Sequence, residues 1–170
     1  YSQICWLPTD IPTGKVYPHY LTNDSFNSTD VHVSPNGKWI CFMSDRSGHA
    51  DFKRMDVWIL PIEGGLPRNM TPNTFEFYNY RPRWSPDSRM LVYTTDETNF
   101  RNVATVDIET GDSTNLTNSN FDEYNPRWSP DGKWIAYVAN IEWNFHIFKI
   151  KADGSSKPMQ LTTGEGVYSG

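Results

Sequence analysis

Basic and amide side chains recur at fixed distances before a repeated Ser-Pro dipeptide. His32, Arg83 and Arg127 each stand two residues before one, and Arg81 and Asn125 stand four residues before one. Charged donors of this kind bind carboxylates and phosphates through strong hydrogen bonds. If the repeated segments surround one axis, these residues form a basic ring that favours an anionic ligand or an acidic peptide segment. The alternative is that they pair with Asp or Glu of adjacent repeats and only hold the repeats together.

Two further segments carry side chains that suit a contact surface. Residues 45–56 mix both signs of charge and contain Arg46, His49 and Phe52, while Trp143 lies in a second polar stretch. Loops often carry recognition residues, so we predict that these four side chains contact a protein partner. The alternatives are a longer solvated hairpin in the first segment and packing of the tryptophan within the sheet.

No residue pattern in the sequence is typical of a catalytic, metal or cofactor site. There is no Gly-x-Ser-x-Gly elbow, no His-Glu-x-x-His pair and no Gly-x-x-x-x-Gly-Lys phosphate loop. The four histidines are scattered, whereas a metal needs ligands that converge. Cys5 and Cys41 lack metal-ligand spacing, and a disulfide between them stays open. We expect no catalytic residue, metal or cofactor, and the sequence leans against an enzyme in this chain alone.

Composition excludes further classes of function. The chain of 170 residues has a formal net charge of −5, and 15% of its residues are aromatic. Nucleic-acid binding needs a basic patch, and none stands out, so we expect no nucleic-acid partner. No apolar run approaches about 18 residues, so we expect no insertion into a membrane. Residues 1–8 have neither a basic start nor a long apolar stretch, so we expect no signal peptide in this chain.

An internal repeat predicts how these residues are positioned. Three aligned segments contain Ser-Pro dipeptides that start at residues 34, 85 and 129. A second marker, Leu-Thr or Met-Thr, follows each dipeptide and also precedes the first one, at residues 21–22, 70–71, 116–117 and 161–162. Two markers in the same order, three times over, are hard to produce by chance.

Each repeat contains segments with the two-residue periodicity of β-strands. One strand approaches the Ser-Pro turn, a second leaves it, a third follows, and the fourth ends at the Leu-Thr marker. The first strand is expected at 80–84 and 124–128. The second is expected at 39–43, 90–94 and 134–138, and the third at 57–60, 103–106 and 147–150. Four strands in about 40–50 residues are typical of a β-propeller blade. The predicted fold is therefore all-β, built of antiparallel four-stranded blades.

The repeat also predicts where the blades begin and end. We expect the last strands of one blade at 1–22, whole blades at 23–71, 72–117 and 118–162, and the start of another at 163–170. Propellers usually close with about 4–8 blades, so residues 1–170 correspond to an incomplete propeller. Exposed strand edges pair readily with other chains. We therefore expect missing blades or self-association to cover the open ends.

The pattern around the turn resembles the TolB-type propeller repeat, also called WD40-like. Residues 126–137 match the run Pro-x-Trp-Ser-Pro-Asp-Gly-Lys-x-Ile-Ala-Tyr throughout, and residues 82–93 match it with substitutions in the second half. The first repeat departs more, with Val33 in place of the tryptophan. The resemblance covers nearly the whole chain. It implies that the motif residues are structural, with Trp84 and Trp128 packed between neighbouring sheets.

The resemblance implies two classes of function. TolB-like blades occur in periplasmic scaffold propellers that bind partner proteins. This implies a non-catalytic module that binds a protein or an anionic ligand through its loops and channel mouth, in a periplasmic or secreted location, with a cytoplasmic one left open. Blades of this type also form the gating propeller of prolyl-oligopeptidase-like and tricorn-like peptidases and the body of oligogalacturonate lyases. The alternative is therefore the propeller portion of a larger enzyme.

Overall fold

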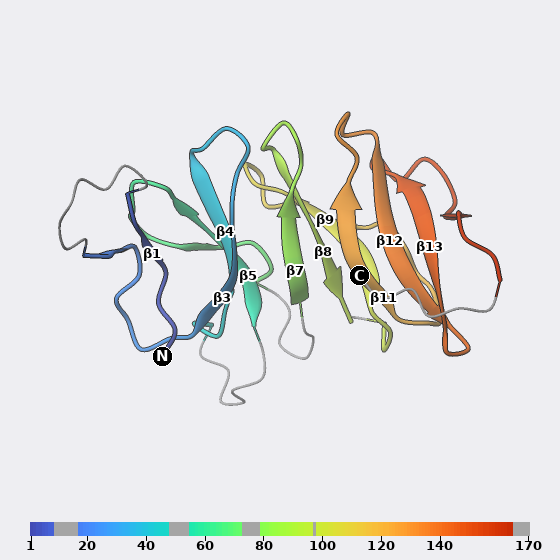
Figure 1. Ribbon diagram of the computed structural model, residues 1–170, viewed down its shortest axis with the longest axis horizontal. Coiled ribbons are helices and arrows are strands. Elements are labelled where there is room, and N and C mark those ends of the chain that lie inside the picture. Colours follow the sequence, from blue (N-terminus) through green and yellow to red (C-terminus); the bar gives the residue numbers. More distant parts are fainter. Residues whose placement is uncertain (9–16, 48–54, 73–78, 97, 165–170) are drawn as a thin grey trace.

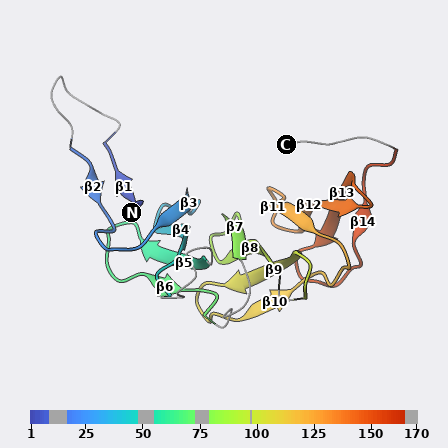
Figure 2. The same cartoon turned by 90° about the horizontal axis from the view of Figure 1, so that it is seen from below.

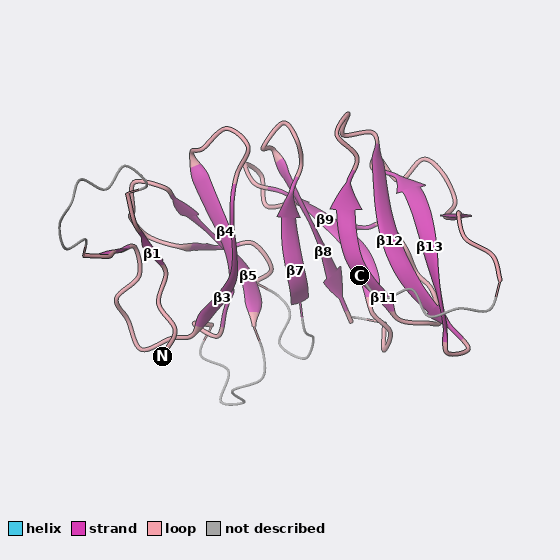
Figure 3. Ribbon diagram, viewed as in Figure 1, coloured by secondary structure: helices cyan, strands magenta, loops and turns pink. Residues whose placement is uncertain are grey.

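The computed structural model describes residues 1–8, 17–47, 55–72, 79–96 and 98–164, with only the backbone described at 79 and 80. These residues form strands joined by turns and loops, and none of them lies in a helix (Figures 1 and 3). The predicted contact residues His49 and Phe52, and the residues 165–170 of the predicted further blade, lie outside the described part.

The described strands form three four-stranded antiparallel sheets, one for each sequence repeat. Blade 1 contains β3 (Ser28–Val33), β4 (Trp39–Ser44), β5 (Asp56–Pro61) and β6 (Arg68–Asn69). Blade 2 contains β7 (Asn79–Trp84), β8 (Met90–Thr95), β9 (Asn102–Asp107) and β10 (Ser113–Asn115). Blade 3 contains β11 (Glu123–Trp128), β12 (Trp134–Ile141), β13 (Asn144–Lys151) and β14 (Met159–Gln160). A two-stranded sheet of β1 (Cys5–Trp6) and β2 (His19–Tyr20) precedes them. The predicted all-β fold of antiparallel four-stranded blades is confirmed, and the partial blade predicted at 163–170 falls mostly outside the described residues.

The blades fan out along an arc. Figure 2 shows β3, β7 and β11 on the concave side and β6, β10 and β14 on the outside. The Ser-Pro turns gather at one end of the blades, which we call the turn face, at the top of Figure 1. The other end, at the bottom of Figure 1, carries the connections at 98–101 and 118–122 and the turn at 142–143, and we call it the loop face. The concave strands are therefore the ones that line the predicted channel.

The Ser-Pro turn is held by its own side chains, in the same way in each blade. In blade 2, Ser85 Oγ donates to Asp87 Oδ1 (2.6 Å) and accepts from the backbone N–H of Met90 (2.9 Å). Ser88 takes φ +63° at the position where the other two turns have glycine. Its hydroxyl accepts from the backbone N–H of Asn36 in blade 1 (3.0 Å), which ties the two turns together.

The threonine of the Leu-Thr marker closes the fourth strand onto the third. In blade 2, Thr117 Oγ1 accepts from Val103 N–H (2.8 Å), and the preceding Leu116 N–H donates to Val103 O (2.9 Å). The same two bonds recur at Thr22, Thr71 and Thr162, where the threonine oxygen lies 2.9–3.0 Å from the nitrogen. A buried backbone N–H needs such a partner, so the marker is a structural device.

The tryptophans of the inner strands join each blade to the one before it. Trp84 is 8% exposed and packs against Cys41, Val57 and other buried residues of blade 1, as predicted. Its indole Nε1 donates to the backbone carbonyl of His32 (3.0 Å). Trp128 repeats the arrangement one blade later and donates to the carbonyl of Arg83 (3.2 Å).

One face of blade 3 lacks the cover that the equivalent faces of blades 1 and 2 have. In blade 2, Val92 and Val103 are fully buried because blade 3 packs on them. Their counterparts in blade 3, Ala136 and Ile147, are only half-buried. Among the described strands, none packs on this face, so residues whose counterparts are covered in blades 1 and 2 are partly exposed here.

The two cysteines do not form a disulfide: Cys5 is exposed and Cys41 is buried. Burial raises the pKa of the Cys41 thiol to about 12, so this residue is a neutral core side chain at physiological pH.

Within the described residues, no helix is long and apolar enough to cross a membrane.

Candidate functional site

Each inner strand has a β-bulge at the same position, which sets where the channel side chains point. Asp30, Arg81 and Asn125 take φ values of 50°, 53° and 52°, and the strand pairing shifts register at each of them. Asp and Asn tolerate this left-handed backbone better than other side chains do. Arg81 is therefore the unusual occupant of this position.

Asp30 changes the predicted basic ring, because it pairs with two of the ring's members. Its Oδ2 accepts from Arg83 Nη1 (3.1 Å), and its Oδ1 lies 3.0 Å from His32 Nε2. Burial acts to raise the pKa of Asp30, but the hydrogen bonds from Arg83 and His32 outweigh it and leave the pKa below 3.8. The bond between Arg83 and Asp30 joins blade 2 to blade 1. Arg83 therefore holds two blades together, as the alternative interpretation of the basic residues predicted. Asp30 was missed, although it stands four residues before Ser34, as Arg81 stands before Ser85.

Arg81 and Arg127 remain as exposed cations of the inner strands. Neither forms an ion pair with any described residue. Among the described residues, the Arg127 guanidinium donates only to the neighbouring carbonyl of Pro126 (2.9 Å). Burial, and next the like charges of Arg83 and Arg81, lower the pKa of Arg127, with Asp30 opposing them. Arg127 therefore shares the concave side with the charges of Arg83, Arg81 and Asp30.

A cleft opens between blades 2 and 3 at the loop face. Its volume is about 290 Å³, and it is lined by Arg81, Thr94, Arg101, Tyr124 and Asn125. Two of the five residues, Arg81 and Asn125, belong to the predicted channel set. The other three come from β8, the 98–101 connection and the start of β11.

Arg101 and Tyr124 are held in place on the wall of this cleft. The Arg101 guanidinium lies over the Tyr124 ring, 5.2 Å from its centroid, and the ring also contacts Phe145 (6.3 Å between centroids). Asp122 accepts from Arg101 N–H through Oδ1 (3.0 Å) and from the Tyr124 hydroxyl through Oδ2 (3.0 Å). Sequence reasoning missed this pair because its residues are 23 positions apart and neither lies in the repeat motif.

Arg46 lies inside blade 1, not on a contact surface. Its guanidinium lies 5.0 Å from the centroid of Phe42 and 5.4 Å from that of Trp58, and it pairs with Asp24 (2.9 Å). The side chain is 6% exposed. This packing leaves Arg46 little surface with which to contact a partner.

Trp143 lies at the tip of the β12–β13 hairpin and is 87% exposed. It forms a two-residue turn with Glu142, and the two take φ values of +67° and +49°. Both signs are those of a type I′ turn, which favours Asn and Gly. A large side chain in this conformation, facing solvent on the loop face, suits contact with a protein partner.

Glu123 is a buried acid that sequence reasoning missed. It is 1% exposed, and its Oε2 accepts from Val103 N–H (3.1 Å) and from the Thr117 hydroxyl. Burial raises its pKa to about 7, although these hydrogen bonds act in the other direction. The equivalent position is Ser28 in blade 1 and Asn79 in blade 2, so the acid belongs to this blade and not to the repeat.

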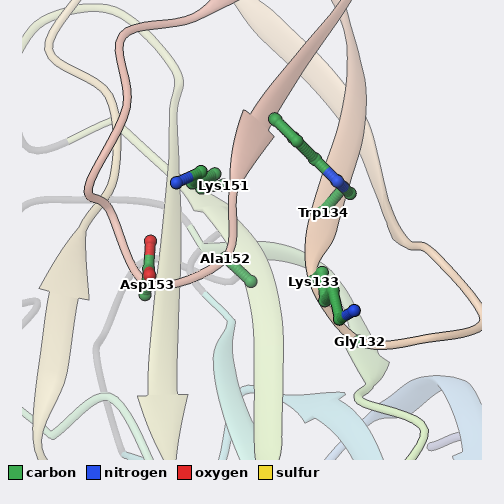
Figure 4. Close-up of a pocket in the computed structure, with 6 residues that line it drawn as sticks. All are labelled: Gly132, Lys133, Trp134, Lys151, Ala152 and Asp153. Carbon is green, nitrogen blue, oxygen red and sulfur yellow. The ribbon is translucent and has the colours of Figure 1, made fainter.

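The turn face has hollows of a different character. One of about 390 Å³ lies on blade 3 between residues 132–134 and 151–153. Figure 4 shows that the amino groups of Lys133 and Lys151 point to opposite sides, so its charged groups do not converge. Another, of about 410 Å³ between blades 2 and 3, is lined by Asp87, Asp131 and Asp153 among others. Within the described part of the chain, no group of three or more His, Cys, Asp or Glu side chains could hold a metal ion.

The turn motif, the threonine marker and the blade contacts agree with a known family of propellers. Residues 11–169 match the family described as the TolB beta propeller domain. The chain belongs to this TolB propeller family. The resemblance read from the sequence is thereby confirmed.

Curated relatives of this TolB propeller chain include longer proteins. An uncharacterized protein of Agrobacterium fabrum is 30% identical over 129 residues, which cover 76% of this chain and 42% of the relative. The uncharacterized peptidase YuxL of Bacillus subtilis is 32% identical over 94 residues, which cover 55% of this chain and 13% of YuxL. The chain therefore spans less than half the length of both relatives.

Solved structures with the same fold come from several classes of protein. A candidate TolB from Agrobacterium tumefaciens matches with a TM-score of 0.72 and 27% identity, over 89% of this chain and 53% of the other. Puromycin hydrolase matches with a TM-score of 0.66 and 20% identity, over 86% of this chain and 23% of the hydrolase. An oligogalacturonate lyase from Vibrio parahaemolyticus matches with a TM-score of 0.65 and 15% identity, over 94% of this chain and 47% of the lyase. The last two likenesses show the fold alone.

Proposed function

We propose that this chain is part of a non-catalytic TolB-like propeller that binds a protein partner, or an anionic ligand, through its loop face and channel mouth. The observation that carries the proposal is the pair of exposed inner-strand arginines, Arg81 and Arg127, which have no carboxylate partner among the described residues. Exposed charge without a structural partner is available to a ligand. His32, Arg83 and Asn125 complete the predicted channel set, with Arg83 committed in part to Asp30.

The remaining features support a protein partner. Trp143 offers a large aromatic surface on the loop face, and tryptophan and arginine are the residues that most often dominate protein interfaces. A periplasmic or secreted location goes with this proposal, since TolB-like scaffolds work there.

A larger enzyme is the second candidate. YuxL is described as a peptidase, and this chain covers only 13% of it. Puromycin hydrolase shares the fold over 23% of its own length. In that case the propeller would be one part of a protein whose catalytic residues lie elsewhere.

The half-covered face of blade 3 bears on both candidates. Ala136 and Ile147 lie where blades 1 and 2 bury their counterparts completely. We propose that further blades or a second copy of the chain cover this face. Light scattering on the natural protein distinguishes further blades from a second copy, because only self-association doubles the mass. A monomer without further blades would contradict the proposal.

Binding and activity assays on the natural full-length protein test the function. We expect it to bind an acidic peptide in a salt-dependent manner and to leave peptides and oligogalacturonides uncleaved. Replacing Arg127 by Ala is expected to weaken binding several-fold. Cleavage of either substrate would favour the enzyme candidate, and no binding of any acidic ligand would overturn the channel-mouth proposal.

A further inference from the structure

We propose that the cleft between blades 2 and 3 is a carboxylate subsite, in which Arg81 and Arg101 bind one acidic side chain of a peptide segment. This inference rests on the proposed function, because it names the place and the chemistry of binding at the channel mouth. The cleft is the one lined by Arg81, Thr94, Arg101, Tyr124 and Asn125.

Arg81 has a backbone conformation that is unusual for an arginine. It takes φ 53° at a bulge where the neighbouring blades place Asp30 and Asn125, residues that adopt this conformation more readily. Unfavourable backbone conformations persist where the side chain has another role, and they cluster at binding sites. The structural role that Asp30 has, an ion pair with the next blade, is absent for Arg81, which forms no ion pair with a described residue. An arginine here is therefore explained by something that it binds.

Arg101 is already positioned for binding by contacts within the protein. Its guanidinium lies 5.2 Å from the centroid of the Tyr124 ring, and its backbone N–H is held by Asp122 (3.0 Å). Asp122 also accepts the Tyr124 hydroxyl, so both of its carboxylate oxygens are engaged. A preordered arginine loses less conformational entropy when it binds a ligand. The planar fork of a guanidinium matches a carboxylate with two parallel hydrogen bonds.

Size and charge define the ligand class. A volume of about 290 Å³ lies just below the range of small-molecule pockets, roughly 300–1,000 Å³, so the cleft suits one side chain better than a chain of sugar rings. The hollow between the same two blades at the turn face is lined by Asp87, Asp131 and Asp153. The hollow at the turn face is thus lined by three carboxylates and the cleft at the loop face by two arginines, so an acidic side chain suits the cleft better.

Anisotropy titrations of the natural full-length protein test the subsite. The probe is a fluorescein-labelled hexaglutamate peptide, with hexaglutamine as the neutral reference and trigalacturonate as a competing carboxylate. R81N is the main variant, because asparagine occupies the same bulge in blade 3. R89N is the matched control: it removes the same charge from a side chain that is 69% exposed at the turn face. R101K keeps the charge and removes the planar fork.

We expect R81N to weaken hexaglutamate binding at least about tenfold, with a melting temperature equal to or above that of the wild type. R89N is expected to stay within about twofold of the wild type, and R101K to weaken binding several-fold. Unchanged affinity in both R81N and R101K would overturn the subsite while leaving the proposed function in place. No hexaglutamate binding by the wild type would overturn the proposed function itself. Displacement by trigalacturonate at lower concentration than by unlabelled hexaglutamate would replace the peptide with a uronate as the ligand.

Discussion

Replacing Glu123 by glutamine removes a buried carboxylate and keeps its shape. The wild-type side chain is 1% exposed and accepts from Val103 N–H and the Thr117 hydroxyl, and it pairs with no cation among the described residues. Glutamine retains an acceptor oxygen for these donors. The substitution therefore isolates the effect of the charge.

The magnitude follows from the pKa of Glu123, which burial raises from 4.5 to about 7. One pKa unit corresponds to about 1.36 kcal/mol, so the full rise amounts to roughly 3 kcal/mol. The unfolded chain releases this proton above pH 4.5, whereas the folded chain holds it until about pH 7. The free energy of unfolding therefore falls as the pH rises from about 4.5 to about 7. The lost stability does not return at higher pH.

Urea unfolding of the natural protein and of E123Q, from pH 5 to pH 8, measures this effect. We expect E123Q to gain stability relative to the wild type as the pH rises, by up to roughly 3 kcal/mol at pH 8. E109Q provides the control, because it makes the same substitution at an exposed side chain. A constant difference between E123Q and the wild type across this range would refute the reasoning, because it would show that Glu123 has an ordinary pKa.

Three further substitutions test other contacts. Trp84→Phe removes the indole that donates to the His32 carbonyl (3.0 Å). We expect it to lower the free energy of unfolding, measured by urea titration, by about 2 kcal/mol. An unchanged urea midpoint would contradict a role of Trp84 in joining the blades. Asp30→Asn breaks the pair with Arg83 (3.1 Å) and is expected to cost about 1 kcal/mol at pH 7. Because the pKa of Asp30 lies below 3.8, that difference should disappear as the pH falls through it, and a difference that persists in acid would argue against the ion pair. Trp143→Gly relieves the φ of +67° and is expected to raise the melting temperature slightly while weakening partner binding; a lower melting temperature would show that the indole packs on the fold.

The repeating contacts could be predicted from the sequence because they are local. The turn is formed by Ser85, Asp87 and Met90, which all lie within one segment of six residues, so a short sequence motif is enough to predict it. The Leu-Thr or Met-Thr marker recurs behind each Ser-Pro dipeptide, so the end of each fourth strand could be placed from the sequence.

The candidate site was only partly predictable, because its geometry depends on contacts between distant residues. Arg46 stands in a charged loop, yet the aromatic rings of Phe42 and Trp58 enclose it. The pairing of Arg101 with Tyr124 joins two blades through residues outside any motif. Burial of a charge depends on what packs around it in space, and a one-dimensional pattern does not carry that information.

The acceptor used by each inner-strand tryptophan has a consequence for how such chains change over time. Trp84 and Trp128 bond to the main-chain carbonyls of His32 and Arg83, so the identity of the accepting side chain is irrelevant. A duplicate of blade 2 or blade 3 carries its own indole donor, whereas blade 1 has Val33 at this position. The main-chain acceptor is present in any blade placed before such a duplicate. This indole bond therefore tolerates a change of the accepting residue in the neighbouring blade, whereas the ion pair of Arg83 with Asp30 requires both partners to be kept together.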